Sequence, residues 1–551
     1  MPAPFAFDGS PHPRKSLRRD ARIVGLLFAS TTSMIGSGWL FGAFHAAKIA
    51  GPLAVWSWVA GAAVILLIAL CFAELASMFP KSGALVHMSH ASHGDGLGRI
   101  WGWMLFLAYV AGAPVESEAM VTYANNYLPG LVVPGSGVLT GIGFAVCAVL
   151  VLVMAVLNLL AVRLLLRLNN AVTWWKIAVP VLTAIVLIAT SFGHPGTGAI
   201  DPGGYDAAGI FLALPAAGIV FSFVGFRMAI DLSGESSDPG RHIPMAVIGS
   251  VVLCAIVYVL LQIGFLSALR PSDLAHGWAR LGFPGQTGPF AGLAAMLGMG
   301  WLAFILYVDA YVSPGGTGLL GITGGSRILY AMGEVGAGPS WLTRLNGGHV
   351  PWLAVVVMWG VGTLYLLPFP AWQKLVDYVT SVTILTYGLG PVALLVLRRN
   401  LPRAERQFRL PIAEIVAPAA FICSNLIVLW AGFKTNTVLM EIVAVGIAAY
   451  AAWFHLIARR PAADFGWREI SWLLPWFGGM LAISALSDIG GGYGILTFWP
   501  AALVTAVWSL IVLATALRCA LVAEKTAGAM ARMAGYDEDA LFIDIPRGSD
   551  R

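Results

Sequence analysis

The sequence predicts an all-α polytopic membrane protein, and two features of its composition carry that prediction. Hydrophobic residues make up 58% and charged residues only 11% of the 551 positions, whereas a soluble domain carries about 25% charged residues. Apolar stretches of about 20 residues, the length of a membrane-spanning helix, recur along the whole chain. The balance of 32 basic against 27 acidic residues is too even to indicate a nucleic-acid partner.

Fourteen spanning helices are expected. They are placed near residues 22–47, 53–78, 101–127, 137–160, 169–192, 208–232, 244–268, 290–318, 351–368, 373–397, 411–432, 436–458, 471–488 and 493–521. The polar segments 1–21 and 524–551 are expected to be a cytoplasmic N-terminal segment and a cytoplasmic tail. Basic residues before the first span lead into a full-length apolar stretch without a small-residue cleavage site, which argues against a cleavable signal peptide.

The distribution of lysine and arginine predicts that both termini face the cytoplasm. With that orientation, 25 basic residues fall in cytoplasmic segments and only four, Arg270, Arg280, Lys374 and Lys434, fall outside. Membrane insertion produces this excess on the cytoplasmic side. An odd number of spans would destroy the asymmetry, so an even number is favoured.

Two spans carry glycine-containing interruptions. The first reads Ile35, Gly36, Ser37, Gly38, and the second reads Phe221, Ser222, Phe223, Val224, Gly225. Glycine weakens a helix, and backbone that is unwound within a bilayer persists where it lines a cavity. The half-helix after the first interruption would point its amides at an anion such as a carboxylate, and freed carbonyls of the second would suit an ammonium group. For the first interruption alone, close helix packing is the alternative.

The two interruptions lie five spans apart, and this odd offset gives the two halves opposite topology. Inverted repeats of this kind, with a substrate site at the midplane, are typical of many secondary transporters. Residues 22–397, spans 1 to 10, are therefore expected to form the transport core. Residues 398–523 are expected to supply accessory spans 11 to 14, of which the last two pack at a dimer interface or against lipid.

Several segments together resemble the amino acid–polyamine–organocation (APC) superfamily of permeases over roughly residues 20–460. They are residues 35–38, 73–75, 80–83, 225–227, 234–235, 238–239, 241–244, 326–333, 339 and 350–351. The resemblance implies a LeuT-like core of five plus five helices that transports amino acids. Within the superfamily, the chain looks most like the aspartate/glutamate:proton symporter branch.

The resemblance also implies roles for the two interruptions. In that superfamily, amides of the first hold the substrate carboxylate, and carbonyls of the second hold its amino group. These roles pass to residues 35–38 and to residues 221–224, respectively. Phe221 and Phe223 are implied to close over the substrate, with ordinary packing as the alternative.

Lys176 lies within the fifth span, where an ionisable group is costly and usually functional. By the resemblance it matches a lysine of proton-coupled members, whose ammonium takes the place of sodium in sodium-coupled relatives. A lysine in apolar surroundings can gain or lose its proton near neutrality. Proton coupling is therefore expected, with Lys176 snorkelling to the cytoplasmic face as the alternative.

Three acidic residues also fall deep within spans. Glu116 and Glu118 point about 200° from each other on a helix, so they cannot both face one cavity. Asp309 precedes residues 313–317, whose proline and glycines predict a further break. Glu116 and Asp309 are candidates for proton coupling, or for neutralising a basic residue in a structural ion pair.

Arg227 stands where the superfamily commonly has an acidic residue. A guanidinium there suits a second substrate carboxylate through a bidentate contact and repels cationic amino acids. A structural salt bridge to Asp231 or Asp309 is the competing explanation.

Polar residues near the expected cytoplasmic face are interpreted structurally. Glu74, Glu235 and Arg327 are assigned to inner-gate or loop-anchoring ion pairs. His87, His90 and His93 share a helix face, but no carboxylate or cysteine completes a ligand set, so a solvated face is favoured over a metal site. The five cysteines lack zinc-ligand spacing, and no nucleotide-binding glycine loop occurs.

The sequence therefore predicts a proton-coupled symporter for acidic amino acids in the cell membrane, not an enzyme, with a proton gradient in place of any cofactor. An amino-acid exchanger or a neutral amino-acid permease of the same superfamily is the alternative. A non-transporting membrane sensor of amino acids is the alternative from another class. The expected partners are an amino acid, protons and lipid, and a homo-oligomer is left open.

Overall fold

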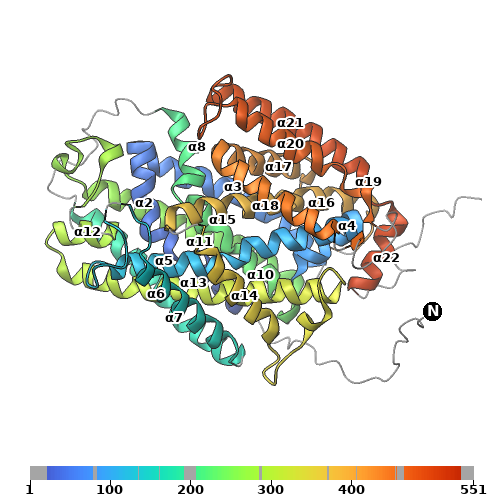
Figure 1. Ribbon diagram of the computed structural model, residues 1–551, viewed down its shortest axis with the longest axis horizontal. Helices are drawn as coiled ribbons and strands as arrows, with labels where there is room; N and C mark the ends of the chain where they lie inside the picture. Colours follow the sequence, from blue (N-terminus) through green and yellow to red (C-terminus); the bar gives the residue numbers. More distant parts are fainter. Residues whose placement is uncertain are drawn as a thin grey trace, which may run out of the picture.

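The computed structural model describes residues 22–78, 83–134, 136–160, 162–190, 206–283, 288–368, 371–404, 406–452, 454–455 and 465–534. The predictions for residues 1–21, for residues 80–82 and for the tail from residue 535 onward lie outside the described residues. Figure 1 shows the helices gathered into one bundle, with α20 and α21 along one edge and α6 and α7 toward the other.

The described part of the predicted core consists mainly of helices joined by loops and short 3₁₀ turns. Its α-helices are α1 (Ile23–Met34), α2 (Ser37–Ala50), α3 (Ala54–Met78), α4 (Ala84–Val110), α5 (Gly112–Ala124), α6 (Gly141–Asn158), α7 (Val162–Thr190), α8 (Ala207–Ala216), α9 (Ile219–Phe223), α10 (Met228–Asp231), α11 (Pro239–Ala268), α12 (Pro289–Met296), α13 (Gly300–Glu334), α14 (Trp352–Tyr365), α15 (Trp372–Tyr387) and α16 (Leu389–Asn400). The accessory helices are α17 (Ala413–Trp430), α18 (Phe433–Ala452), α19 (Trp467–Ile470), α20 (Leu473–Leu486), α21 (Phe498–Cys519) and α22 (Ala523–Ala534). Among the described residues, β-pairing is limited to two isolated bridges, so the predicted all-α class is confirmed.

Each predicted span overlaps at least one of these helices, but the number of fourteen spans is not confirmed. By length and composition, ten helices in the described ranges could cross a membrane, or eleven if the bent pair formed by α8 and the segment Ile219–Asp231 is one span. The difference arises partly because α1 and α14 have only 12 and 14 residues. It also arises because α2 runs on into α3 as one helical segment of 42 residues, and because α13, which follows α12 in the predicted span 290–318, is not among the ten.

The predicted break at residues 313–317 is wrong. α13 runs without interruption from Gly300 to Glu334 and includes Pro314. The glycines of this segment allow close approach instead: a Cβ atom at Gly316 would lie 3.1 Å from Lys176 Nζ, and one at Gly318 would lie 2.6 Å from Met154 Sδ. Small residues serve membrane helices in this way because they let neighbours pack tightly.

The predicted solvated face at His87, His90 and His93 is also wrong. These side chains are only 2%, 3% and 0% exposed, because α18, α19 and α22 pack against α4. His93 Nε2 lies 3.1 Å from the carbonyl oxygen of Ala516 in α21, and His90 Nδ1 lies 3.2 Å from Asp95. The part of the chain that the structure describes holds no group of three side chains able to bind a metal.

The predicted ion pairs are confirmed. Arg327 Nε lies 2.8 Å from Glu235 Oε1, which joins α13 to the turn after α10. Glu74, near the end of α3, forms ion pairs with two arginines. Its Oε2 lies 2.6 Å from Arg398 Nη2, and its Oε1 lies 3.1 Å from Arg406 Nε. Glu74 is fully buried, so it anchors α16 and the loop that follows.

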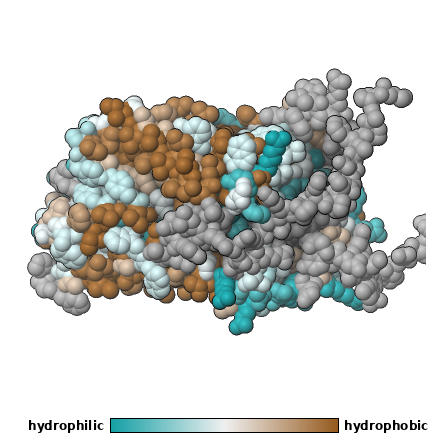
Figure 2. All heavy atoms as spheres, turned by 90° about the horizontal axis from the view of Figure 1, so that it is seen from below, coloured by the Kyte–Doolittle hydropathy of each residue, from teal (hydrophilic) through white to brown (hydrophobic). Residues whose placement is uncertain are grey.

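The accessory helices pack directly on the core. α17 lies against α3, α15 and α21, and α18 lies against α15 and α20. On α20 and α21, Leu474 and Leu503 remain 80% and 67% exposed, as contact with lipid allows. Figure 2 shows hydrophobic side chains in a broad band across one face, with strongly hydrophilic ones gathered beside it. The surface is that of a membrane protein.

Candidate functional site

The first predicted interruption lies between α1 and α2. Ile35 has φ −80° and ψ 78°, and Gly36 has φ −115° and ψ −143°, so both residues leave helical geometry. A Cβ atom at Gly36 would lie 2.5 Å from Glu116 Oε1 and 2.7 Å from Thr317 Oγ1. Gly36 is therefore the point at which α5 and α13 approach the interrupted backbone.

Glu116 on α5 caps the half-helix that follows. Its Oε2 accepts a hydrogen bond from the Ser37 amide at 2.8 Å, the favourable place for a negative charge at a helix N-terminus. The amides of Gly38 and Trp39, next in the first turn, have no acceptor within the helix. A protein carboxylate therefore uses the first amide of the expected anion site, and the role of the next amides in holding a substrate stays a prediction.

Glu118 faces away from this site. It interacts electrostatically with Cys147 of α6, and neither of its carboxylate oxygens has a hydrogen-bond partner among the described residues. The predicted opposition of Glu116 and Glu118 on one helix is confirmed.

The second interruption lies earlier than the sequence suggests. α8 meets the segment Ile219–Asp231 at an angle of 60°, at Gly218, whose φ of 73° is left-handed and suits glycine. Residues 221–225, where the break is predicted, continue instead as the end of α9 and the start of the 3₁₀ turn Val224–Arg227. The sharp change of direction needs one left-handed residue, not a long unwound stretch.

Two tyrosine hydroxyls bind carbonyls of the interrupted segments. Tyr258 on α11 donates to the Met34 carbonyl oxygen at 2.8 Å and lies 3.2 Å from that of Ser222. Tyr387 on α15 donates to the Val224 carbonyl oxygen at 2.7 Å. Unsatisfied backbone groups within a bilayer cost several kcal/mol each, and these hydroxyls remove that cost. Tyr258 contacts both interruptions.

The interrupted helices touch each other through glycine. A side chain at Gly38 would collide with the Ser222 hydroxyl, and one at Gly225 would collide with the backbone of Ser33 and Met34. The two interrupted spans therefore pack directly against each other, with α2 facing α9 and α1 facing the 3₁₀ turn.

The two candidate lid residues separate in space. The Phe221 ring borders the first interruption, because a Cβ atom at Gly38 would lie 3.3 Å from Phe221 Cδ1. Phe223 is fully buried and packs on Trp58 and Tyr258, with ring centres 6.1 and 5.2 Å away. Only Phe221 is placed to act as a lid, and Phe223 has the packing role.

Lys176 is a residue of α7, and its side chain contacts the last turn of α1. The side chain is fully buried, which excludes snorkelling to the cytoplasmic face. Its Nζ donates to the Thr32 carbonyl oxygen at 2.7 Å and lies 2.9 Å from Thr317 Oγ1. The Thr317 hydroxyl donates to the same carbonyl at 2.8 Å. That carbonyl is free because the Gly36 amide bonds to the Met34 carbonyl instead. The ammonium thus bridges α7, α1 and α13 at the interruption.

Asp309 lies on the same α7–α13 interface. Its Oδ1 accepts hydrogen bonds from Trp175 Nε1 and Ser313 Oγ, both at 2.8 Å, and its Oδ2 has no hydrogen-bond partner in the described ranges. Trp175 precedes Lys176 in sequence, but the acid and the ammonium are not within ion-pair distance there.

Arg227 is held by aromatic rings. Its guanidinium carbon lies 3.5 Å from the centre of the Tyr109 ring and 5.7 Å from that of Tyr387. Among the described residues, neither Asp231 nor Asp309 pairs with it, so the competing structural salt bridge does not form. Arg227 Nη1 and both carboxylate oxygens of Asp231 lack hydrogen-bond partners in that part of the chain.

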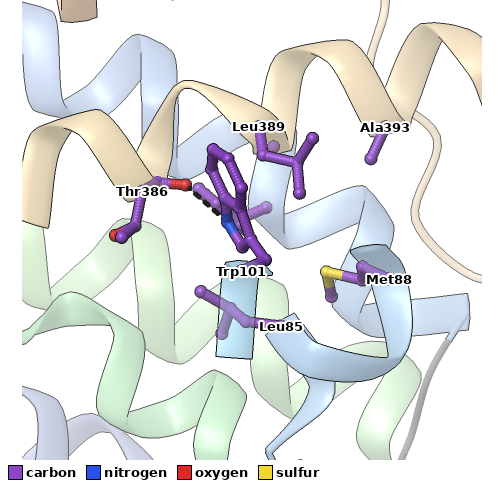
Figure 3. Close-up of a pocket in the computed structure, with 8 residues that line it drawn as sticks. Leu85, Met88, Trp101, Thr386, Leu389 and Ala393 are labelled. Atoms are coloured by element: carbon purple, nitrogen blue, oxygen red, sulfur yellow. Dashed lines mark hydrogen bonds between the residues drawn. The ribbon is translucent and has the colours of Figure 1, made fainter. Parts of the chain in front are cut away.

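A small cavity of about 10 Å³ lies elsewhere, between α3, α4, α15 and α16 (Figure 3). Trp101 Nε1 donates to the Thr386 carbonyl oxygen beside it at 3.2 Å. Its volume is at the lower limit for one water molecule, and its lining is mostly apolar. It is a packing defect away from the interruptions.

Sequence reasoning missed several residues of this region. They are Thr32 and Thr173, whose hydroxyls bond to each other, Trp372, whose indole donates to Ser37 Oγ at 2.9 Å, and Tyr109, Tyr258 and Tyr387. A lone hydroxyl in an apolar span is the signal that could have identified most of them, because such a group needs a buried partner.

The sequence model of the family described as Amino acid permease matches residues 23–457, from the start of α1 to just beyond α18. The chain belongs to this family of the APC superfamily. Its members are transporters, so the predictions of a permease and of a chain that is not an enzyme are confirmed, and the helical architecture fits the LeuT-like fold.

Individual relatives cover nearly the whole permease. The glutamate/serine transporter AimA of Bacillus subtilis (strain 168) is 38% identical over 517 residues, 91% of this chain and 94% of that protein. The aspartate-proton symporter of the same organism is 29% identical over 484 residues, 88% of this chain and 93% of that protein. The branched-chain amino acid permease BcaP, also from that organism, is 27% identical over 452 residues, 79% and 93% of the two chains.

Proposed function

We propose that this permease is a proton-coupled symporter of acidic amino acids, and that it works by alternating access around the two interrupted helices. Its family makes it an amino-acid transporter. What we propose beyond the family is that protons drive transport and that the substrates are acidic amino acids.

The position of Lys176 carries the proposal of proton coupling. The ammonium binds a carbonyl that exists as a free acceptor only because α1 ends there. Any change in the interruption during transport would alter this acceptor, so the stability of the charged lysine is linked to the conformation. Two acids would take part in proton transfer. They are Glu116, which accepts from the Ser37 amide, and Asp309, which accepts from the Trp175 indole.

Three observations support an acidic substrate. AimA and the aspartate-proton symporter both carry an acidic amino acid in their names. The Gly38 and Trp39 amides in the first turn of α2 have no acceptor within the helix and suit the α-carboxylate. Arg227 adds a buried positive charge next to that interruption, which suits a second carboxylate.

The proposed location is the cell membrane with both termini in the cytoplasm. The lysine and arginine distribution supports this orientation. The ion pairs of Glu74 and Glu235 then lie on the cytoplasmic side, below the interruptions.

Uptake of labelled glutamate and aspartate into proteoliposomes, in sodium-free buffer with and without an inward proton gradient, tests the proposal. We expect accumulation only with the gradient, competed by the other acidic amino acid and not by leucine or arginine. Accumulation of neither would overturn the acidic substrate. Gradient-independent counterflow would identify an exchanger, competition by serine alone a neutral permease, and binding without flux a sensor.

A further inference from the structure

Arg227 and Asp231 are a basic and an acidic side chain, one helical turn apart, that are buried and form no ion pair with each other. The Arg227 guanidinium interacts with the Tyr387 hydroxyl, which leaves Nη1 without a partner among the described residues. Arg227 is 6% exposed and Asp231 is 0% exposed. Within the described residues, Arg227 Nη1, Asp231 Oδ1 and Asp231 Oδ2 have no hydrogen-bond partner, and neither has the nearby hydroxyl of Tyr109. Buried polar groups are normally paired, so four unpaired atoms in one place require an explanation.

These residues lie beside α1, away from α2. The 3₁₀ turn Val224–Arg227 and α10 pack along α1, whereas α9 packs along α2. Ser30 of α1 fixes this register: its hydroxyl donates to the Phe226 carbonyl oxygen and accepts from the Ala229 amide, both at 3.0 Å. In the proposed orientation, α1 is the cytoplasmic half of the first interrupted span, so Arg227 and Asp231 lie between the interruptions and the cytoplasm.

Among the described residues, no acid lies within ion-pair distance of Arg227 and no base lies within ion-pair distance of Asp231. The Tyr109 ring covers a face of the guanidinium, but a ring face accepts no hydrogen bond in the plane of the N–H groups. Arg327, the basic residue that interacts with Asp231, is already bound to Glu235 at 2.8 Å. An unpaired buried charge is strongly unfavourable, and a molecule that carries both a carboxylate and an ammonium would satisfy both side chains.

We infer that Arg227 and Asp231 form a second substrate station on the cytoplasmic side of the interruptions, for amino acids with an acidic side chain. Arg227 takes the side-chain carboxylate while the α-carboxylate and the amino group are still held at the interruptions. Asp231, one turn further along, takes the ammonium as the substrate moves toward the cytoplasm. The inference rests on the proposed function for the orientation and the substrate class.

Side-specific kinetics test the station. Glutamate transport without a pH gradient is measured in right-side-out and inside-out membrane vesicles of expressing cells, with glutamine, the neutral isostere, as a competitor. Arg227→Gln should raise KM for glutamate about tenfold at the cytoplasmic face, the loss of one charged contact, and leave KM at the external face and the glutamine inhibition constants within about twofold. Asp231→Asn should weaken glutamate and glutamine together at the cytoplasmic face, because both carry the ammonium.

Arg344→Gln, which removes an exposed arginine from the loop before α14, is the matched control and should change neither face. Without a gradient, the ratio of Vmax to KM must be the same for inward and outward transport. A higher KM at the cytoplasmic face must therefore be accompanied by an equally higher Vmax for outward transport. Equal shifts at both faces, or no shift, in Arg227→Gln would overturn the station. If Arg227→Gln does not fold, Arg227→Lys and Asp231→Asn are measured in its place. The station is overturned if neither variant changes KM at the cytoplasmic face alone. Wild-type vesicles that do not transport glutamate would instead overturn the proposed function.

Discussion

Two buried cations flank the first interruption, and the structure surrounds them in opposite ways. Lys176 bonds to a backbone carbonyl and a threonine hydroxyl, both set by the end of α1. Arg227 stacks on Tyr109 and keeps Nη1 without a hydrogen-bond partner among the described residues. This difference matches the two roles that we propose: the charge on Lys176 would respond to the conformation of the protein, and the charge on Arg227 would bind a ligand.

Lys176→Ala should have the largest effect, because it tests the conformational half of this comparison. Removal of the ammonium leaves the Thr32 carbonyl and the Thr317 hydroxyl short of a donor, and an unsatisfied buried group costs about 1–3 kcal/mol. We expect gradient-driven accumulation to be abolished while exchange or substrate binding persists. Uptake and counterflow in proteoliposomes measure the two activities separately.

Lys525→Ala removes an exposed lysine of α22 and serves as the control for a changed charge. It should accumulate substrate like the wild type. Unchanged concentrative uptake in Lys176→Ala would remove this residue from the coupling role and leave only a structural one.

Glu116→Gln should have the next largest effect. A glutamine oxygen can still accept from the Ser37 amide, so α2 stays capped, but no proton can be exchanged there. We expect accumulation to fall about tenfold, equivalent to about 1.4 kcal/mol of lost driving force, with exchange largely retained. The pH dependence of uptake is the measurement, and it should flatten.

Glu118→Gln provides the matched comparison, two residues along the same helix. Glu118 is as buried as Glu116 but faces α6, so its replacement should leave the pH dependence in place. If both variants flatten the profile equally, the site at the Ser37 amide has no special part in coupling.

Arg227→Ala tests the ligand half of the comparison. Removal of a charged hydrogen bond, worth about 1.5–3 kcal/mol, should weaken aspartate and glutamate at the cytoplasmic face, measured in inside-out vesicles, much more than a neutral amino acid. Competition against a labelled substrate by members of each class measures the difference. An equal loss for both classes would show that the stack on Tyr109 is structural.

The sequence predicts the class of the fold and the existence of the site better than its local geometry. Composition and the spacing of apolar stretches report burial in lipid, and glycines mark where backbones approach. The same glycines do not report whether a helix breaks: residues 313–317 stay helical because neighbouring side chains fill the space beside them. Gly218 bends its span because it takes a left-handed conformation, which its neighbours in sequence do not specify.

The partners of the buried charges depend on tertiary contacts and could not be predicted. Glu74 finds Arg398, more than 300 positions later, and the covering of the histidines depends on accessory helices from the far end of the chain. A sequence pattern identifies costly groups, and only the packing of distant helices determines what satisfies each of them.

Tyr258→Phe should have the smallest effect and provides the baseline for the comparison. The Tyr258 hydroxyl lies against carbonyls of both interruptions, so its loss should loosen both by about 0.5–1.5 kcal/mol, the net value of one hydrogen bond. We expect a modest fall in thermal stability and in Vmax, with the ratio of glutamate to neutral substrate and the pH profile unchanged. Tyr365→Phe, which removes a hydroxyl paired with Tyr378 between α14 and α15, is the control for a lost tyrosine bond outside the site. A change in substrate preference in Tyr258→Phe alone would mean that this hydroxyl contacts the substrate, and that the two interruptions share more than a structural link.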